Sequence, residues 1–179
     1  MIIGPKTLLK LVREKNLVEN LSERELTNPE GAGFDLRLGE VYKIKGKSFL
    51  GVDERKTPDV LLIAKFNRIK RKSIKIKPGD YLLVKTIEKV NLPENIGAVL
   101  YTRGTLFRSG VLHGLSQIAP GYCGELVTSL YNAGPCIVEI ELGSRFVHVQ
   151  FSIVEGGGSA YRGQWKGGRV TTRKKEKQV

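Results

Sequence analysis

Apolar and polar residues alternate with a period of two along most of the chain from residue 33 onward. Such alternation is typical of β-strands that bury one face. Seven segments show it, namely residues 34–44, 73–77, 80–90, 96–102, 124–132, 136–142 and 145–155. Turn signals rich in glycine, proline and asparagine separate the segments, and almost no helical pattern lies between them. The pattern predicts an all-β fold, either an antiparallel sandwich or a distorted, jelly-roll-like β-barrel.

A short helix is predicted at the N-terminus. Pro5 suits the first position of a helix, and an apolar stripe of leucine and valine follows it up to about Lys15. Residues 20–33 and 45–62 follow neither period, so we expect loops or irregular insertions there.

The chain has the length of one domain, at 179 residues, and it contains no internal repeat. We expect a single domain over residues 1–168, followed by a basic, flexible tail over residues 169–179. No apolar run approaches the roughly 20 residues that cross a bilayer. The two cysteines and two histidines fit no zinc pattern, so we expect no protein-bound metal and a cytoplasmic protein with reduced thiols.

Positive charge narrows the range of partners. A formal net charge of +12 suits a partner with many negative charges, such as nucleotide phosphates, nucleic acid or an anionic membrane. Residues 65–77 are strongly basic, but their only aromatic residue is Phe66. Because RNA-binding surfaces interleave aromatic and basic side chains, we expect a solvated strand face there, and neither nucleic acid nor a membrane as the partner.

The segment TRGTLFR (102–108) concentrates groups that bind phosphate. Arg103 and Arg108 bracket Gly104 and Thr105, so two guanidinium groups, a hydroxyl and backbone N–H groups lie close together in the sequence. We therefore expect these four residues to bind the phosphates of a nucleotide.

Seven motifs, in order along the chain, are similar to those of the dUTPase and dCTP deaminase superfamily. They are AGFDLRLG (32–39), KPGDYLLVKTIEKVNLPENIGA (77–98), TRGTLFR (102–108), QIAPGYCGEL (117–126), LYNAG (130–134), GSRFVHVQF (143–151) and YRGQ (161–164). The resemblance covers roughly residues 32–165, and the N-terminal helix resembles that of the deaminase branch. It implies a dUTPase-like distorted β-barrel that forms a homotrimer, with active sites between subunits and a deoxynucleoside triphosphate bound together with Mg²⁺.

The resemblance also implies roles for further residues. Tyr122 would lie against the deoxyribose and exclude a 2′-hydroxyl, and the backbone around Val127 and Ser129 would bind the edge of the base. Arg162 and Gln164, in the glycine-rich C-terminal stretch, would close over the nucleotide. The Mg²⁺ ion would be carried by the substrate triphosphate.

Two departures from the family pattern bear on the reaction. Ser129 stands where the deaminase branch has the glutamate that shuttles protons, and Ala119 stands where the dUTPase branch has the aspartate that activates water. Neither side chain can take a proton from water near neutral pH. Asp35 is the first candidate for another carboxylate that activates water, and Glu125 is the second.

Several interpretations remain open. Hydrolysis can proceed with weak help from a base, because losing one costs about 10²–10⁴-fold in rate. His113 and His148 are further candidates for a base. We expect hydrolysis of dUTP to dUMP and diphosphate first, and deamination of dCTP second, alone or coupled to hydrolysis. A non-catalytic deoxynucleotide-binding protein comes third, and a nucleic-acid-binding role last.

Overall fold

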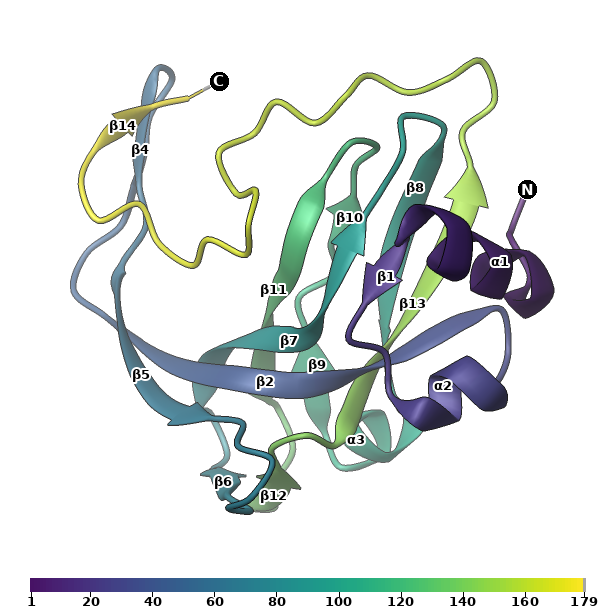
Figure 1. Cartoon of the computed structure of the whole chain (residues 1–179). Helices are drawn as coiled ribbons and strands as arrows, with labels where there is room; N and C mark the ends of the chain where they lie inside the picture. The colour runs from purple at the N-terminus through teal and green to yellow at the C-terminus, as the bar shows by residue number, and fades with distance from the viewer. Residues whose placement is uncertain (179) are drawn as a thin grey trace.

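The computed structural model describes residues 1–178, which contain three helices and fourteen strands (Figure 1). The helices are α1 (Pro5–Lys15), α2 (Glu23–Thr27) and α3 (Gly104–Arg108). The strands are β1 (Val18–Glu19), β2 (Gly33–Lys45), β3 (Phe49–Leu50), β4 (Glu54–Lys56), β5 (Asp59–Lys65), β6 (Ser73–Ile76), β7 (Tyr81–Asn91), β8 (Ile96–Thr102), β9 (Val111–His113), β10 (Gln117–Ile118), β11 (Cys123–Asn132), β12 (Val138–Glu141), β13 (Arg145–Ile153) and β14 (Glu176–Lys177).

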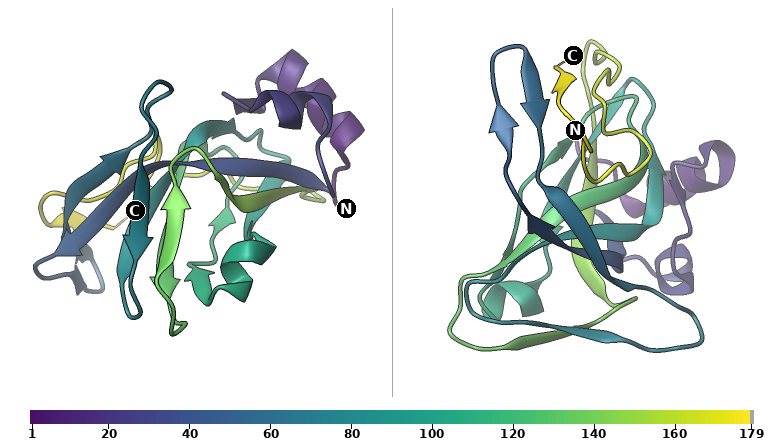
Figure 2. Two further views of the ribbon diagram at one scale, coloured as in Figure 1. Left: turned by 90° about the horizontal axis from the view of Figure 1, so that it is seen from below. Right: turned by 90° about the vertical axis from the view of Figure 1, so that its left-hand side faces the viewer.

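One large, curled sheet dominates the fold (Figure 2). Its strand order is β10-β8-β13-β2-β7-β11-β9, with β5 added beside β2 and β1 beside β7. β12 pairs with β6 in a two-stranded ribbon, and β14 joins β4 and β3 in a third, small sheet. The predicted fold class, a mostly β protein with a curled, barrel-like sheet and an N-terminal helix, is confirmed.

Strand β2 is the centre of the curl. Its first half pairs with β13, and its second half pairs with β7 and β5. The register with β7 shifts between Leu38 and Glu40. A Cβ atom on Gly39, between them, would lie 2.9 Å from the carbonyl oxygen of Thr86, so only glycine lets the two strands approach this closely.

The alternation that predicted the strands also places the core. Along β7, Leu82, Val84 and Val90 are buried while their neighbours are partly exposed. Phe146 and Phe151 of β13 are fully buried. The phenyl rings bury the largest apolar areas and so contribute most to the hydrophobic stabilisation of the sheet.

The helix α1 has the predicted bounds, and it lies with α2 beside the first half of β2 (Figure 1). It ends at Asn16, whose left-handed backbone (φ 52°) lets the N–H of that residue donate to the carbonyl oxygens of Leu11 and Val12. Leu8 is the residue of α1 that is fully buried against the core.

The two segments expected to be loops or irregular insertions, residues 20–33 and 45–62, also contain short regular elements that were not predicted. In the first segment α2 forms, capped by the Ser22 side chain, which accepts a hydrogen bond from the backbone N–H of Glu25. Glu25 is fully buried, so contacts with distant residues stabilise this helix and no apolar period indicates it. In the second segment, β3 and β4 pair with each other, and β14 completes their sheet from the far end of the chain.

Candidate functional site

A cavity of about 640 Å³ lies between the large sheet and the chain that follows β13, residues 154–178, which we call the C-terminal segment. Its walls come from three parts of the chain: Ile44, Thr57, Pro58, Tyr81 and Leu83 from the N-terminal half, Ser116, Gln117, Ile118, Ala119, Tyr122, Leu126 and Val127 from β10 to β11, and Tyr161, Trp165, Arg169 and Val170 from the C-terminal segment. None of these described residues is a carboxylate. The cavity has the size and the mostly apolar, aromatic lining typical of small-molecule sites.

Tyr122 lies at the centre of this cavity's wall. Its side chain is buried, and its hydroxyl donates hydrogen bonds to the carbonyl oxygens of Glu125 (2.7 Å) and Trp165 (3.2 Å). Burial raises the pKa of Tyr122 to about 12, so the hydroxyl stays protonated and keeps donating near neutral pH. The ring packs edge-on against Tyr161, with 5.3 Å between the ring centroids. Tyr122 therefore ties the turn before β11 to the C-terminal segment.

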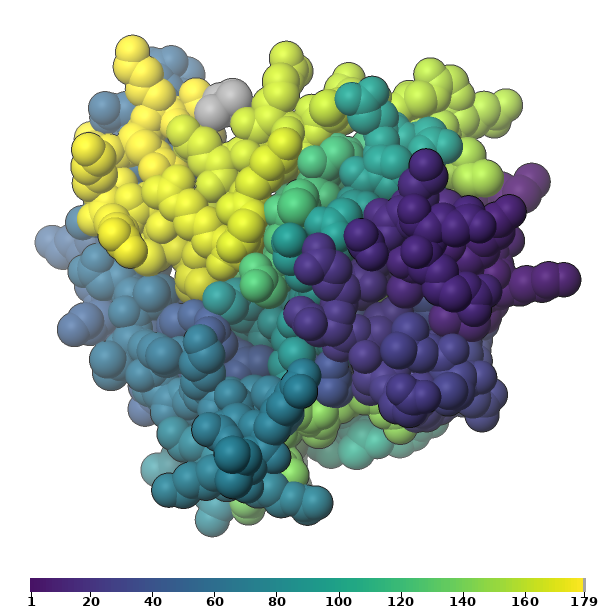
Figure 3. Space-filling model, in the orientation of Figure 1, coloured from purple at the N-terminus to yellow at the C-terminus, as the bar shows by residue number. Residues whose placement is uncertain are grey.

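The C-terminal segment closes one side of the cavity, and it covers the strands beneath it in the space-filling view (Figure 3). Two guanidinium groups lie over the Trp165 ring, with Arg55 at 4.8 Å and Arg169 at 5.7 Å from its centroid. Glu176 pairs with both arginines. The predicted flexibility of residues 169–179 stays a prediction; in the structure β14 pairs with β4.

The two polar residues predicted to close over the nucleotide lie outside the cavity wall. The Gln164 side chain accepts a hydrogen bond from Arg55, and Arg162 is exposed. Tyr161 and Trp165, the aromatic residues that favour a functional segment over a flexible linker in the sequence, line the cavity instead. An aromatic residue in a glycine-rich stretch was the available signal, since flexible linkers seldom carry one.

Strand β11 forms the floor of the cavity through Leu126 and Val127. The predicted base-binding backbone is partly used within the fold. The N–H of Leu126 donates to the Thr86 hydroxyl (2.9 Å), and the carbonyl oxygen of Ser129 accepts from the N–H of Gly114 (3.2 Å). Ser129 itself is buried and does not line the cavity.

Glu125, the second candidate for activating water, lies under the C-terminal segment. It stands opposite Lys89 on β7. Gly168 packs directly on it, because a Cβ atom there would lie 2.7 Å from Glu125 Oε2. Glu125 is not among the residues that line the cavity.

The predicted phosphate-binding residues lie around α3, at the opposite end of β8 from the cavity (Figure 1). Arg103 occupies the N-cap position of α3, and Gly104, Thr105 and Arg108 belong to the helix. The Arg108 guanidinium donates to the carbonyl oxygen of Gly104 at 3.3 Å. Arg103 and Thr105 line a second hollow, of about 480 Å³, together with Arg145.

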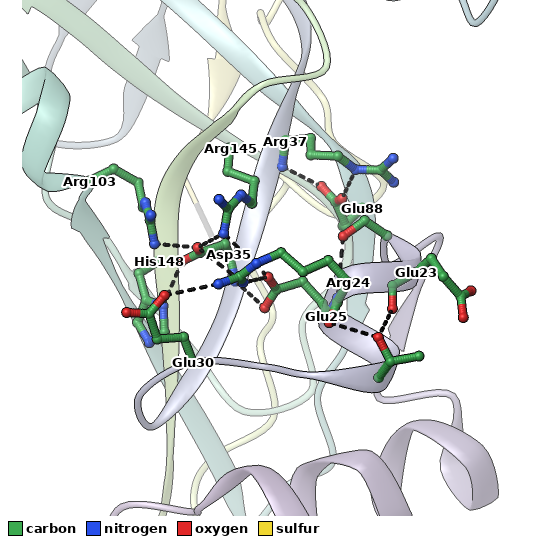
Figure 4. A network of polar contacts seen from close by, with 12 residues as sticks. Glu23, Arg24, Glu25, Glu30, Asp35, Arg37, Glu88, Arg103, Arg145 and His148 are labelled. Atoms are coloured by element: carbon green, nitrogen blue, oxygen red, sulfur yellow. Dashed lines mark hydrogen bonds and ion pairs between the residues drawn. The ribbon is translucent and has the colours of Figure 1, made fainter.

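Asp35 is the centre of a buried polar network (Figure 4). One of its oxygens accepts from both Arg103 and Arg145, the latter at 2.9 Å. The other oxygen lies 2.9 Å from His148 Nδ1. Burial raises the pKa of Asp35, but the hydrogen bonds from His148 and Arg103 outweigh it and hold the pKa below its ordinary value. The structure thus brings Asp35 and Arg103 together and places Glu125 elsewhere.

Two further groups of charged side chains lie next to the Asp35 network in Figure 4. Glu25 of α2 accepts from the backbone N–H of Asp35 (3.0 Å) and pairs with Arg24. Arg37, two residues after Asp35, pairs with the buried Glu88 on β7 at 2.6 Å instead of with Asp35. The sequence analysis missed Arg24 and Glu25, although a Ser22 followed three residues later by Glu25 is the signature of a helix start.

Within residues 1–178, no three His, Cys, Asp or Glu side chains are arranged to hold a metal ion. No helix in that range is long and apolar enough to cross a membrane. A divalent cation carried by a substrate's phosphates takes much of its coordination from phosphate oxygens and water.

Comparison with known proteins agrees with the geometry. The family model described as dCTP deaminase-like matches residues 2–154. A dCTP deaminase of Pyrococcus furiosus is 33% identical over 157 residues, which is 87% of this chain and 88% of that protein. A deoxyuridine 5′-triphosphate nucleotidohydrolase of Methanocaldococcus jannaschii is 30% identical over 171 residues, or 93% of this chain and 99% of that protein.

A solved structure confirms the fold independently. The 2′-deoxycytidine 5′-triphosphate deaminase of Agrobacterium tumefaciens superimposes with a TM-score of 0.66 at 16% identity. The match covers 86% of this chain and 48% of that longer chain, so this chain spans about half of it. Sequence motifs, sheet topology and the family match agree, and the chain belongs to the dCTP deaminase-like family.

Proposed function

We propose that the chain hydrolyses dUTP to dUMP and diphosphate, with Mg²⁺ carried by the substrate triphosphate. The observation that supports hydrolysis most directly is the lining of the 640 Å³ cavity, which has no carboxylate among its described residues. Deamination needs a group that moves protons beside the base, whereas hydrolysis needs one beside the phosphates. The titratable side chains Asp35 and His148 lie with Arg103, away from the cavity.

In this proposal the cavity holds the nucleoside. Tyr122 would lie against the deoxyribose, where a buried ring leaves no space for a 2′-hydroxyl. The methyl group of Ala119 and the side chain of Val127 would contact the nucleoside from the turn and from β11. Arg103 and Thr105 would bind phosphate oxygens through charged hydrogen bonds and backbone N–H groups.

The distance between the cavity and the Arg103 hollow supports an active site that is shared between two copies of the chain. The cavity and the Arg103 hollow have no lining residue in common. Ile118 of β10 pairs with Ala98 of β8. Arg103 directly follows the last residue of the same strand, roughly 15 Å from Ala98 at the usual rise per residue. We infer that one copy binds the nucleoside and another binds its phosphates, as the expected homotrimer would allow.

Incubation with dUTP, dCTP, dTTP and UTP in Mg²⁺, with products separated by charge and base, tests the reaction. The expected result is dUMP and diphosphate from dUTP, with little product from UTP. Thermal stabilisation by dUTP without any product would instead identify a non-catalytic nucleotide-binding protein.

Deamination of dCTP is the second candidate, because the Pyrococcus furiosus relative is named a dCTP deaminase. The same incubation distinguishes it. Conversion of dCTP to a uracil nucleotide, seen as a change in absorbance when the base loses its amine, would replace the first proposal by this one.

Subunit mixing tests the shared site. Arg103→Ala removes a phosphate-side residue and Tyr122→Ala removes a nucleoside-side residue. If each site draws on two copies, mixed trimers of the two inactive variants contain some intact sites and regain activity. Mixtures that stay as inactive as the separate variants would place the whole site within one copy.

A further inference from the structure

Three side chains from neighbouring strands form a row beside the Arg103 hollow. His148 of β13 stands directly opposite Asp35 of β2 on one side and Tyr101 of β8 on the other. His148 Nδ1 lies 2.9 Å from Asp35 Oδ1, a hydrogen-bond distance. Because β13 lies between β2 and β8, the sheet itself fixes how the carboxylate and the imidazole face each other.

Asp35 has little capacity left to contact a water molecule. Its Oδ2 accepts from Arg103 and Arg145, and its Oδ1 faces His148. The side chain is only 1% exposed. Despite burial, hydrogen bonds from His148 and Arg103 hold the pKa of Asp35 below its ordinary value. Asp35 is therefore suited to orient and stabilise a neighbouring group, in the way that a buried aspartate does in a hydrolase triad.

His148 has one ring nitrogen free for such a task. A carboxylate at Nδ1 favours the tautomer that carries its proton there, which leaves Nε2 as an acceptor. The His148 side chain is 21% exposed, and within residues 1–178 no hydrogen bond to Nε2 is formed. Gly33 lies beside this nitrogen, since a Cβ atom there would approach it to 2.7 Å. The absence of a side chain at Gly33 leaves room for the imidazole ring.

The groups around the imidazole are mixed in charge. They are Asp35 and Gly33 from β2, Tyr101 from β8, Arg103 at the start of α3, Arg145 from β13, Arg24 and Glu25 from α2, and Glu30 from the following loop. Arg24 is shared between Glu25 and Glu30. Arg103 and Arg145 add positive charge next to Asp35.

We propose that His148 is the general base that activates the attacking water, with Asp35 as the positioning residue. The inference rests on the proposed hydrolysis and supplies the proton acceptor that Ala119 cannot provide. Water's oxygen bonds to the α-phosphorus while the bond from that phosphorus to the bridging oxygen breaks. The proton leaves the water for Nε2, diphosphate departs with the bridging oxygen, and the imidazole later returns the proton to solvent.

Two substitutions separate the functions of the two ring nitrogens. His148→Asn keeps an amide N–H near the position of Nδ1 and has no group at Nε2. His148→Gln places an amide near Nε2, which can donate to a phosphate but cannot take a proton. Both variants should lose about 10²–10⁴-fold in kcat, the usual effect of removing a general base. Their Kd for a non-hydrolysable dUTP with an imido link between the α- and β-phosphates should change little.

The pH dependence and chemical rescue identify the proton acceptor. Wild-type kcat should fall on acidification, as imidazole side chains take up a proton, and both variants should lack this acid limb. Added imidazole should raise the rate of His148→Ala. Asp35→Asn should lower kcat while the acid limb remains, because His148 still accepts the proton but a carboxylate no longer orients it.

Tyr131→Phe is the matched control, because Tyr131 is 42% exposed on β11, outside the Asp35–His148 network. It should keep the wild-type kcat and pH profile, and melting temperatures should confirm that every variant folds. An unchanged kcat in His148→Asn and His148→Gln would overturn the inference and leave the hydrolysis proposal standing. So would a lowered kcat with the acid limb retained and no imidazole rescue. If the wild-type chain released no diphosphate from dUTP, both proposals would be wrong.

Discussion

Glu40 of β2 and Lys85 of β7 are cross-strand partners, and Lys85 Nζ lies 2.6 Å from Glu40 Oε2. Lys65 of β5 contacts the other oxygen at 2.9 Å, and the Tyr42 hydroxyl donates to the same carboxylate. Burial alone raises the pKa of Glu40, but hydrogen bonds from Lys85, Tyr42 and Lys65 outweigh it and lower the pKa to about 2. The carboxylate joins three adjacent strands at the bend of the sheet.

Glu40→Gln should destabilise the fold near neutral pH by about 3 kcal/mol, the equivalent of the pKa difference between folded and unfolded chains. Because the folded pKa is depressed, this stabilisation is fully present above the unfolded value and disappears as the pH falls toward about 2. Urea unfolding of both proteins between pH 7 and pH 2.5 measures it. A difference that stays constant over that range would contradict the assignment.

Arg103→Ala should weaken binding of the imido analogue of dUTP by about 10- to 100-fold, through loss of charged hydrogen bonds of about 1.5–3 kcal/mol. Binding of deoxyuridine, which lacks phosphate, should not change. Titration calorimetry compares the two ligands. Arg68→Ala, at an exposed loop position, controls for loss of one positive charge; an equal loss of affinity there would indicate a general electrostatic effect.

Tyr122→Phe should loosen the C-terminal segment, because it removes the hydroxyl that donates to the carbonyl oxygens of Glu125 and Trp165. The expected cost is about 1–2 kcal/mol. Trypsin should then cut after Arg162 and Lys166 up to about tenfold faster. Tyr131→Phe, on an exposed ring of β11, should leave the cleavage rate unchanged.

Gly33→Ala should disrupt the contact between β2 and β13. The added Cβ would lie 1.9 Å from the carbonyl oxygen of Val149, a backbone atom that cannot move without shifting the strand. We expect a loss of about 3 kcal/mol or more in unfolding free energy. Gly97→Ala on β8 is the control, since its nearest neighbouring atom would lie at an ordinary 3.6 Å. Equal melting temperatures for the two variants would refute the steric argument.

Local patterns in the sequence were sufficient for the regular elements. Pro5 and the leucine stripe predicted the bounds of α1. Alternation located strands such as β7 and β8, because a strand that buries one face has apolar residues at every second position. The helix α2 and the paired strands β3 and β4 were not predicted. A five-residue helix carries no apolar period, and β4 depends on β14, which lies more than a hundred residues away.

In the candidate site, too, the sequence predicted individual residues but not the contacts between them. Motif order identified Asp35 and Arg103 as candidates, but their direct contact joins residues 68 positions apart and could not be inferred from either motif. The pairing of His148 with Asp35 depends on the register of β13 against β2. The contact of Arg55 with Trp165 depends on where the C-terminal segment returns. Each is set by tertiary packing, which a local pattern does not encode.

The C-terminal segment is itself part of the cavity wall, which has a consequence for its local stability. Tyr161 and Trp165 line the cavity from the chain's end, and the backbone N–H of Tyr161 holds the turn at Pro120 through a 2.7 Å hydrogen bond. A ligand that contacts both rings binds only while the segment is docked on the sheet. Bound ligand should therefore slow amide hydrogen exchange in residues 161–170, where local opening breaks these contacts.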